Sequence, residues 1–478
     1  MLTSKLIIMK RHKKLFISVL FFAGLTLFSC KKWIDVAPKT QIESSRFLSN
    51  RQGFVEALTG VYIKMVATNM YGKELSFGFI DVLGSSYTNN GSTAYRTAFS
   101  GNYQDQAVMN IITSIYSNTY NAIANINNIL EQIDHVDKSI FAAGEYELIK
   151  GEALGLRAFL HFDMLRLHTK SYKDGGVNTL GIPYVTTYSG TVTPRSTVKD
   201  DITKIIADLN LAEQLLKGEL IETGVSSTTV NSTFDARKER FNYYAIKATK
   251  ARAYLWAQDN VNALKEAEAV IAVAPSRFPF INLSALTAAD PNKNRVFTTE
   301  HIFGLTAERL QQNITAVLDS SLRTGSLQYM SSTRVNQQYE GIITDIRSQY
   351  MIKQVAAQYY YTKLHQPQIS RRMPLIKIPE MYYIAAECLS TSNPARAVDY
   401  LNIVRRSRGI TADLSQTSST AQILTEIEKE YRKEFPNEGQ IFFFHKRQNS
   451  NAVIGVSGTN QTLRYVLPLP QQELDFGF

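Results

Sequence analysis

Residues 379–408 read PEMYYIAAECLSTSNPARAVDYLNIVRRSR, and this stretch decides the fold class. Apolar residues recur at helical spacing over about 379–391 and again over 394–408, which predicts two consecutive helices. Ala385 and Ala397 are small, so they let the two helices approach each other closely. Leu401 and Val404 follow at the spacing of packing residues. The stretch therefore predicts a packed helix pair.

A second helix pair with the same spacing lies earlier in the chain. Its spacing matches that of a tetratricopeptide repeat. The small residue, the aromatic residue, the second alanine, the packing residue and the terminal proline of such a repeat correspond here to Ala251, Tyr254, Ala263, Val270 and Pro275. In both pairs the two alanines are twelve residues apart. Both copies lack the full consensus and 134 residues separate them, so we interpret them as tetratricopeptide-like pairs within one fold.

Helical periodicity is also the main pattern in the rest of the chain. In one helix, over about 114–133, apolar residues repeat at intervals of three and four. Further helical patterns cover about 147–168, 198–217, 241–257, 260–273 and 420–435. Strand-like alternation is scarce, so the sequence predicts a mainly α protein.

Long segments without regular patterns separate these helices. They cover 81–106, 219–240, about 276–372 and 448–464. Loops this long in a compact domain usually serve binding. Because no linker divides the chain, we expect residues 30–478 to form one domain with a helical scaffold and a ligand face built from loops.

Composition limits the function classes. The 478 residues are 44% apolar and carry a formal net charge of +10. The first 29 residues hold five of the cations and no acid, so the other 449 residues carry a net charge of only +5. This mild excess does not favour nucleic-acid binding.

The N-terminal 29 residues have the pattern of an export signal. A basic cluster over 10–14 precedes the apolar run Leu15–Phe28, which is too short to cross a bilayer but fits a signal peptide. Leu27-Phe28-Ser29-Cys30 resembles a bacterial lipobox, which predicts lipidation of Cys30 and a firm membrane anchor. An ordinary signal with an incidental cysteine is the alternative. The chain has only one other cysteine, Cys388. If Cys30 is lipidated, Cys388 has no disulfide partner, so we expect it to be a buried apolar residue.

Motifs of catalysis are weak in this chain. Ser196 and Lys199 match an S-x-x-K pattern, but they stand where a helix begins and where serine or threonine serves as an N-cap. His161 and His168 would be about 10.5 Å apart along a helix, too far to bind one metal ion. Glu145, Glu147 and Glu152 could supply the carboxylate pair of a glycosidase, but their position around a helix start favours an interaction with the helix dipole. We therefore predict no metal, no cofactor and no enzymatic activity.

Several motifs, in order, resemble the SusD/RagB family of surface nutrient-binding lipoproteins of Bacteroidetes. The matching segments are Cys30–Pro38, Tyr116–Asn127, Glu152–Leu165, Gly181–Pro183, Pro194–Val198, Ile378–Glu387, Leu401–Gly409, Glu430–Arg447 and Tyr465–Leu474. Two positions depart from the family pattern, because Ile441 replaces an expected arginine and Phe444 an expected aspartate. The ion pair usual there is missing, so we expect altered local packing.

The resemblance implies a right-handed superhelical scaffold of tetratricopeptide-like helix pairs with long irregular loops. It implies a non-catalytic protein that is lipid-anchored at the outer membrane and exposed at the cell surface. Such a protein captures an oligosaccharide, or another oligomeric nutrient, and delivers it to a SusC-like TonB-dependent transporter. The alternative is an envelope adaptor lipoprotein whose repeats scaffold a protein complex. A third hypothesis is an exported hydrolase, but the sequence contains no recognisable set of catalytic residues.

The resemblance also locates a ligand face on the loops 81–106 and about 276–372. Sugars lay their apolar faces on aromatic rings while their hydroxyls take polar partners. Trp33 and Trp256 are expected to be structural, so tyrosines must supply the rings. The predicted ligand-binding residues are Tyr87, Tyr95, Tyr103, Tyr329, Tyr339, Asn89, Asn90 and Gln338.

Overall fold

The computed structural model describes residues 44–224, 234–289, 292–322, 326–365, 371–456 and 464–476. Two compact units divide the chain, residues 1–47 and residues 48–478. The described part of the first unit is the short helix α2 (Ser44–Phe47). Cys30 and Trp33 lie outside the described residues, and so does the predicted signal peptide.

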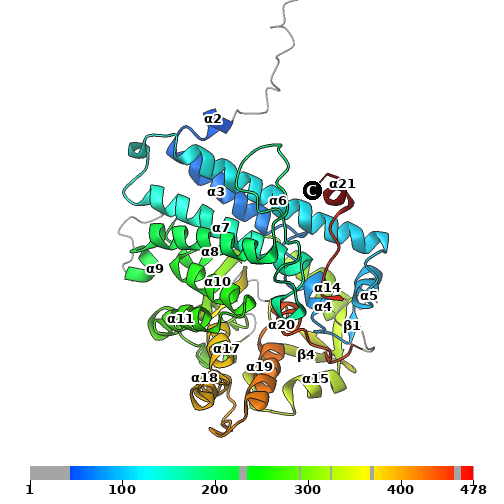
Figure 1. Ribbon diagram of the computed structural model, residues 1–478. Coiled ribbons are helices and arrows are strands. Elements are labelled where there is room, and N and C mark those ends of the chain that lie inside the picture. Colours follow the sequence, from blue (N-terminus) through cyan, green and yellow to red (C-terminus); the bar gives the residue numbers. More distant parts are fainter. Residues whose placement is uncertain are drawn as a thin grey trace, which may run out of the picture. The chain divides into compact units, whose positions relative to one another are not determined.

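Helices dominate the second unit, and they pack in chain order (Figure 1). The main ones are α3 (Arg51–Met65), α6 (Gln106–Ile133), α7 (Glu145–His168), α8 (Val198–Leu216), α10 (Tyr243–Trp256), α11 (Asn260–Ile271), α17 (Ile378–Leu389), α18 (Pro394–Ser407), α19 (Thr420–Glu434) and α20 (Gln440–Gln448). Each packs against its successor in this series, and α11 packs against α17 although about 100 residues separate them. The mainly α fold is confirmed.

Small residues allow the close helix contacts, as the sequence predicts. Ala251 and Ala263 are fully buried in the pair α10–α11, and Ala385 and Ala397 are fully buried in the pair α17–α18. On α7, a Cβ added to Gly155 would lie 2.4 Å from the ring of Phe241. Only glycine permits this approach, because carbon atoms do not pack so closely.

Two small antiparallel sheets lie in segments that the sequence indicates to be irregular. One has the strand order β1 (Asn89–Asn90), β3 (Gln328–Ser331), β5 (Gln358–Tyr361), β4 (Ile352–Val355). The other pairs β2 (His301–Thr306) with β6 (Arg372–Lys377). The expectation of an irregular segment over 276–372 is therefore wrong. Strand β2 is buried on both faces except at its last residue, so its sequence shows no alternation.

Shorter helices connect these elements. They are α4 (Phe79–Leu83), α5 (Thr93–Phe99), α9 (Leu220–Thr223), α12 (Ala274–Arg277), α13 (Ser284–Thr287), α14 (Leu310–Leu318), α15 (Ser332–Tyr339), α16 (Ile346–Tyr350) and α21 (Gln471–Phe476). The labelled 3₁₀ turns of the described residues are η2 (Lys138–Ile140), η3 (Tyr172–Asp174), η4 (Arg237–Glu239), η5 (Thr298–Glu300) and η6 (Ser320–Leu322). None of the helices in the described ranges is long and apolar enough to cross a membrane.

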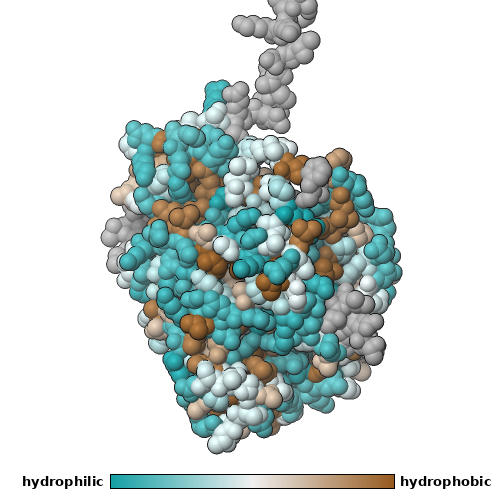
Figure 2. All heavy atoms as spheres, in the orientation of Figure 1, coloured by the Kyte–Doolittle hydropathy of each residue, from teal (hydrophilic) through white to brown (hydrophobic). Residues whose placement is uncertain are grey.

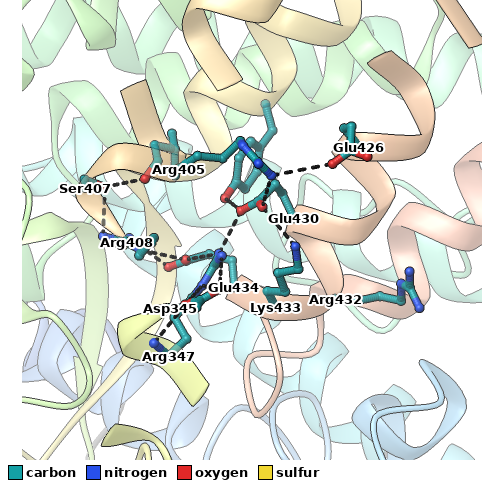
Figure 3. A network of polar contacts seen from close by, with 12 residues as sticks. Asp345, Arg347, Arg405, Ser407, Arg408, Glu426, Glu430, Arg432, Lys433 and Glu434 are labelled. Carbon is teal, nitrogen blue, oxygen red and sulfur yellow. Dashed lines mark hydrogen bonds and ion pairs between the residues drawn. The ribbon is translucent and has the colours of Figure 1, made fainter. Parts of the chain in front are cut away.

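A network of buried charges joins the C-terminal helices to the segment before them (Figure 3). Arg347 is 0% exposed and forms ion pairs with Asp345 (2.8 Å), Glu430 (2.9 Å) and Glu434 (3.2 Å). Glu434 also binds Arg408 at 2.9 Å. Because buried charges are tolerated only when they are paired, these contacts fix α16, α18 and α19 relative to one another.

Other expectations about single residues can be compared with the structure. Thr197 is the N-cap of α8, since its side chain accepts a hydrogen bond from the Asp200 backbone N–H (3.1 Å). Cys388 is buried, and burial raises the pKa of its thiol to about 12. The interpretation of Cys388 as a buried apolar residue is confirmed.

The ring of Phe444 stacks on Tyr431 with centroids 4.4 Å apart. Aromatic packing therefore occupies the place where the family pattern has an ion pair.

Candidate functional site

Six of the eight predicted ligand-binding residues are buried. Tyr87 is only 1% exposed, and Tyr95, Tyr103, Tyr339, Asn90 and Gln338 are buried as well. A ring without an exposed face gives a sugar no surface on which to stack. In this structure these six side chains therefore do not form the platform that the sequence predicts.

Hydrogen bonds explain why three of these tyrosines are buried. The hydroxyl of Tyr87 donates to Asp81 (2.8 Å), that of Tyr95 to Glu74 (2.7 Å), and that of Tyr103 to the Arg464 carbonyl (2.6 Å). Each ring packs in the interior while its hydroxyl satisfies a buried acceptor. These tyrosines hold the early loop onto the scaffold.

Asn90, Gln338 and Tyr339 are also packing residues. Gln338 donates to the Tyr361 hydroxyl and to the Arg432 carbonyl, each at 2.7 Å, and so ties α15 to α19. Tyr339 is enclosed near Arg347, and burial raises its pKa strongly. Asn90 pairs with Gln328 on the inner face of the sheet. Polarity in a loop sequence does not by itself distinguish a ligand contact from such an anchor.

Asn89 and Tyr329 differ, because both are half-buried and lie on the outer face of the four-stranded sheet. Asn89 pairs with Tyr329 across β1 and β3, and Tyr360 pairs with Lys353 across β5 and β4. The ring centroids of Tyr329 and Tyr360 lie 6.0 Å apart and join the two pairs. The result is a polar and aromatic row across four strands, which we call the strand row. Tyr360 is only 5% exposed, so its ring packs against Tyr329 and offers a ligand no free face. Lys353 was not predicted as a ligand-binding residue, whereas Tyr360 belongs to the tyrosine run 359–361 that the sequence places in the predicted ligand face.

A large cavity, which we call the main cavity, lies between the connection from α3 to α4, helix α6 and helix α14. Its volume is about 590 Å³. It is lined by Thr68, Asn69, Lys73, Glu74, Asn110, Ile111, Ser114, Arg309, Gln312, Asn313 and Ala316. The volume falls within the range of small-molecule sites. Sequence reasoning missed this cavity, because its residues come from three distant segments and form no motif.

Local turns position the wall of the main cavity. A Cβ at Gly72 would lie 2.0 Å from the Val66 carbonyl oxygen, so the tight turn in this connection requires glycine. The Asn313 side chain donates to the Gly72 carbonyl (3.1 Å), and the Asn69 side chain donates to the Ser114 hydroxyl (3.2 Å). These contacts hold the connection against α14 and α6.

The chemistry of the main cavity suits hydrogen bonding to a polar, hydroxyl-rich ligand. Four of its eleven lining residues are amides, and two are hydroxyl residues. The charge of Lys73 is balanced by Glu74 at 3.0 Å, while Arg309 is exposed at the wall. Among the described residues, no group of three histidine, cysteine or acidic side chains would hold a metal ion.

Helix α14 connects the two features. Its residues Gln312, Asn313 and Ala316 line the main cavity, and the same helix contacts β3, which carries Tyr329. Helix α5 also contacts an element of each feature, because it packs against β1 of the strand row and against α6 of the main cavity. The main cavity and the strand row are therefore built on common supports.

Comparisons with known proteins identify the family. Residues 32–255 match a family described as "Starch-binding associating with outer membrane", and residues 222–461 match the SusD family. None of the curated proteins matches the chain.

Solved structures give the same fold. A SusD superfamily protein from Bacteroides thetaiotaomicron is 21% identical with a TM-score of 0.69, over 89% of this chain and 97% of that one. A second from the same species is 16% identical with a TM-score of 0.70, over 90% and 97%. A SusD-like carbohydrate binding protein from Bacteroides vulgatus is 20% identical with a TM-score of 0.64, over 84% of each chain. Since one family match alone covers half of the sequence, the chain belongs to the SusD/RagB family.

Proposed function

We propose that this protein is a non-catalytic lipoprotein of the outer membrane that captures an oligosaccharide, or another oligomeric nutrient. It then delivers the ligand to a SusC-like TonB-dependent transporter. Membership of the SusD/RagB family supports the binding role, and one of the similar solved structures is a carbohydrate binding protein. The anchor of the protein would be the lipidated Cys30.

The observation that carries this proposal is that helix α14 both lines the main cavity and contacts strand β3 of the strand row. The amides and hydroxyls of the main cavity would bind the hydroxyls of one sugar unit. The half-buried ring of Tyr329 would stack on the apolar face of another unit, with Asn89 as a polar neighbour. Helix α14 supports both, so one extended ligand would contact both.

Two point variants test this assignment, with binding measured by affinity electrophoresis and titration calorimetry. The ligands are soluble starch, dextran, xylan and pectin fragments. We expect Gln312→Ala and Tyr329→Ala each to weaken binding of the same glycan. Tyr188→Ala removes an exposed tyrosine outside both features, so it is the matched control and should bind like the wild type. Two test variants that fold and bind like the wild type would place the ligand elsewhere.

Co-purification tests the delivery step. The protein is extracted in mild detergent from cells that express the transporter encoded next to it. We expect a large β-barrel protein to co-purify with it. Recovery with soluble protein partners only, together with no glycan binding, would favour the adaptor alternative.

A further inference from the structure

A second cavity, which we call the C-terminal cavity, lies between α6, the segment 183–193 and the C-terminal segment 470–476. Its volume is about 330 Å³. Its lining residues are Tyr116, Ser117, Tyr120, Pro183, Val185, Ser189, Thr191, Val192, Thr193, Pro470, Gln472, Glu473 and Phe476. None of these residues lines the main cavity.

The two cavities lie on different sides of α6. The main cavity uses Asn110, Ile111 and Ser114 of this helix, whereas the C-terminal cavity uses Tyr116, Ser117 and Tyr120. At 3.6 residues per turn, the centres of these two sets are separated by roughly 120° around the helix axis. A ligand in one cavity therefore meets a different set of side chains from a ligand in the other.

One wall of the C-terminal cavity is aromatic and well supported. The rings of Tyr116 and Tyr120 have centroids 4.6 Å apart, and the edge of His168 packs on Tyr116 at 5.2 Å. The Tyr120 hydroxyl donates to the Pro183 carbonyl (3.0 Å), and the Asn127 side chain donates to the Val185 carbonyl (2.9 Å). These bonds fix the segment 183–185 on α6, so this part of the cavity is preformed.

The opposite wall carries one charge. Glu473 is the only charged residue of the lining, and it forms no ion pair within the part of the chain that the structure describes. The Arg195 guanidinium lies in its vicinity but donates to the carbonyls of Gly181 (2.8 Å) and Leu180 (3.3 Å). Burial raises the pKa of the Glu473 carboxyl, while the Tyr116 hydroxyl and Arg195 oppose the rise. Because the Arg195 guanidinium is bonded to backbone carbonyls and forms no ion pair with it, this half-buried carboxylate is incompletely compensated.

Apolar side chains form the rim of the C-terminal cavity. Val192 is 48% exposed and Phe476 is 68% exposed, although both are apolar. In Figure 2, brown surface gathers around the C-terminal helix α21 and the loop beside it. Exposed apolar surface next to a cavity is typical of an interaction site.

We infer that the C-terminal cavity is a second binding site, which takes a primary ammonium group carried on an apolar body of about one ring in size. The ammonium group would pair with Glu473 and lie near the rings of Tyr116 and Tyr120, where cations are favoured. The apolar body would contact Val192 and Phe476. Two sources share this chemistry, a free amine and the lysine side chain of a peptide.

Titration calorimetry of the full protein at neutral pH and low salt tests the charge requirement. The probes are phenethylammonium chloride and its uncharged analogue phenethyl alcohol. We expect the ammonium compound to bind with a Kd of about 1 mM or below, and the alcohol to bind at least about tenfold more weakly. Equal binding of both probes, or no binding of the ammonium compound at concentrations of about 10 mM, would overturn the inference.

A pair of variants tests the role of the carboxylate. Glu473→Gln removes the charge inside the C-terminal cavity, and Asp475→Asn removes the same charge two residues later, outside the lining. We expect Glu473→Gln to bind the ammonium probe about tenfold more weakly, and Asp475→Asn to bind like the wild type. The inference is wrong if Glu473→Gln retains wild-type affinity for the ammonium probe. The comparison of the two probes on the wild type does not depend on the folding of either variant.

A blocked tripeptide distinguishes the two sources. Acetyl-Ala-Lys-Ala-amide is compared with the same peptide containing norleucine in place of lysine. Binding of the lysine peptide assigns the cavity to peptide side chains, whereas binding of the free amine alone assigns it to small amines. Failure of phenethylammonium to bind rejects the inference whatever the peptide does, and this result leaves glycan binding in the main cavity untouched.

Discussion

Replacement of Arg347 by methionine should destabilise the protein strongly, because its guanidinium neutralises three buried carboxylates. Asp345 accepts two hydrogen bonds from this side chain near 2.9 Å, and within the described residues it has no other ion-pair partner. Glu430 and Glu434 keep other cations, Lys433 and Arg408 among them. In the Arg347→Met variant, Asp345 would therefore be a buried charge without compensation. Breaking a buried ion pair in this way costs about 3–5 kcal/mol.

The effect should depend on pH in a defined direction. Burial would raise the pKa of Glu430, but Arg347 and Lys433 outweigh it and lower the pKa to about 2. Because the folded pKa is below the value of the unfolded chain, this stabilisation is complete above about pH 4.5 and is lost as the pH falls toward 2. The deficit of Arg347→Met relative to the wild type should therefore be largest at neutral pH and should shrink in acid.

Urea unfolding followed by circular dichroism measures this difference, since urea does not screen charges. Arg406→Met is the matched control, because Arg406 also binds an aspartate but is 59% exposed. Exposed ion pairs contribute little, so this variant should unfold like the wild type. The reasoning is refuted if Arg347→Met loses less than about 1 kcal/mol at neutral pH, or if both variants lose equal stability.

Four further predictions follow from single sites. Tyr329→Ala should weaken glycan binding about 5- to 150-fold through loss of a stacking ring, whereas Tyr329→Phe should retain most affinity; equal affinities in a titration of both variants would exclude stacking. Cys388 should resist an aromatic disulfide reagent until the protein unfolds, because it is buried with a raised pKa; rapid labelling of the native protein would contradict this. The free energy of unfolding should fall as the pH drops below about 6.5, because burial lowers the pKa of four histidines and the unfolded chain binds more protons; a flat profile between pH 6.5 and 5 in urea titrations would be inconsistent with it. Cys30→Ala should abolish palmitate labelling in growing cells, and a variant that still labels would disprove the anchor.

Several helices with an apolar face were predictable from the sequence almost to the residue, although α6 (Gln106–Ile133) begins eight residues before the predicted range 114–133. The pattern over 198–217 corresponds to Val198–Leu216, and that over 394–408 to Pro394–Ser407. Helix α3 has no such clear pattern, since Gly53 and Gly60 lie within it and Ile63 is exposed. The strands were not predictable, because they have two to six residues and most of them pair with partners far away in the chain; the hairpin of β4 and β5 is the local exception.

The ligand face was only partly predictable. Asn89 and Tyr329 belong to the proposed site, but their pairing joins segments about 240 residues apart, and no local signal indicates it. A tyrosine such as Tyr87 looks equally suitable in the sequence, yet its hydroxyl bonds to Asp81 in the interior. Burial separates the two roles, and burial depends on tertiary contacts that a loop sequence does not reveal.

The buried charges also constrain how the chain can be synthesised. Arg347 leaves the ribosome 83 residues before Glu430, so the nascent chain must keep this guanidinium in water until α19 has emerged. A chain that stops before Glu430 would lack the acids that Arg347, Arg405 and Arg408 share with α19. Helices α6 and α7, by contrast, can pair as soon as both have been made, because they contact each other directly. The charges that α16 and α18 share with α19 can therefore all be paired only after α19 has been made.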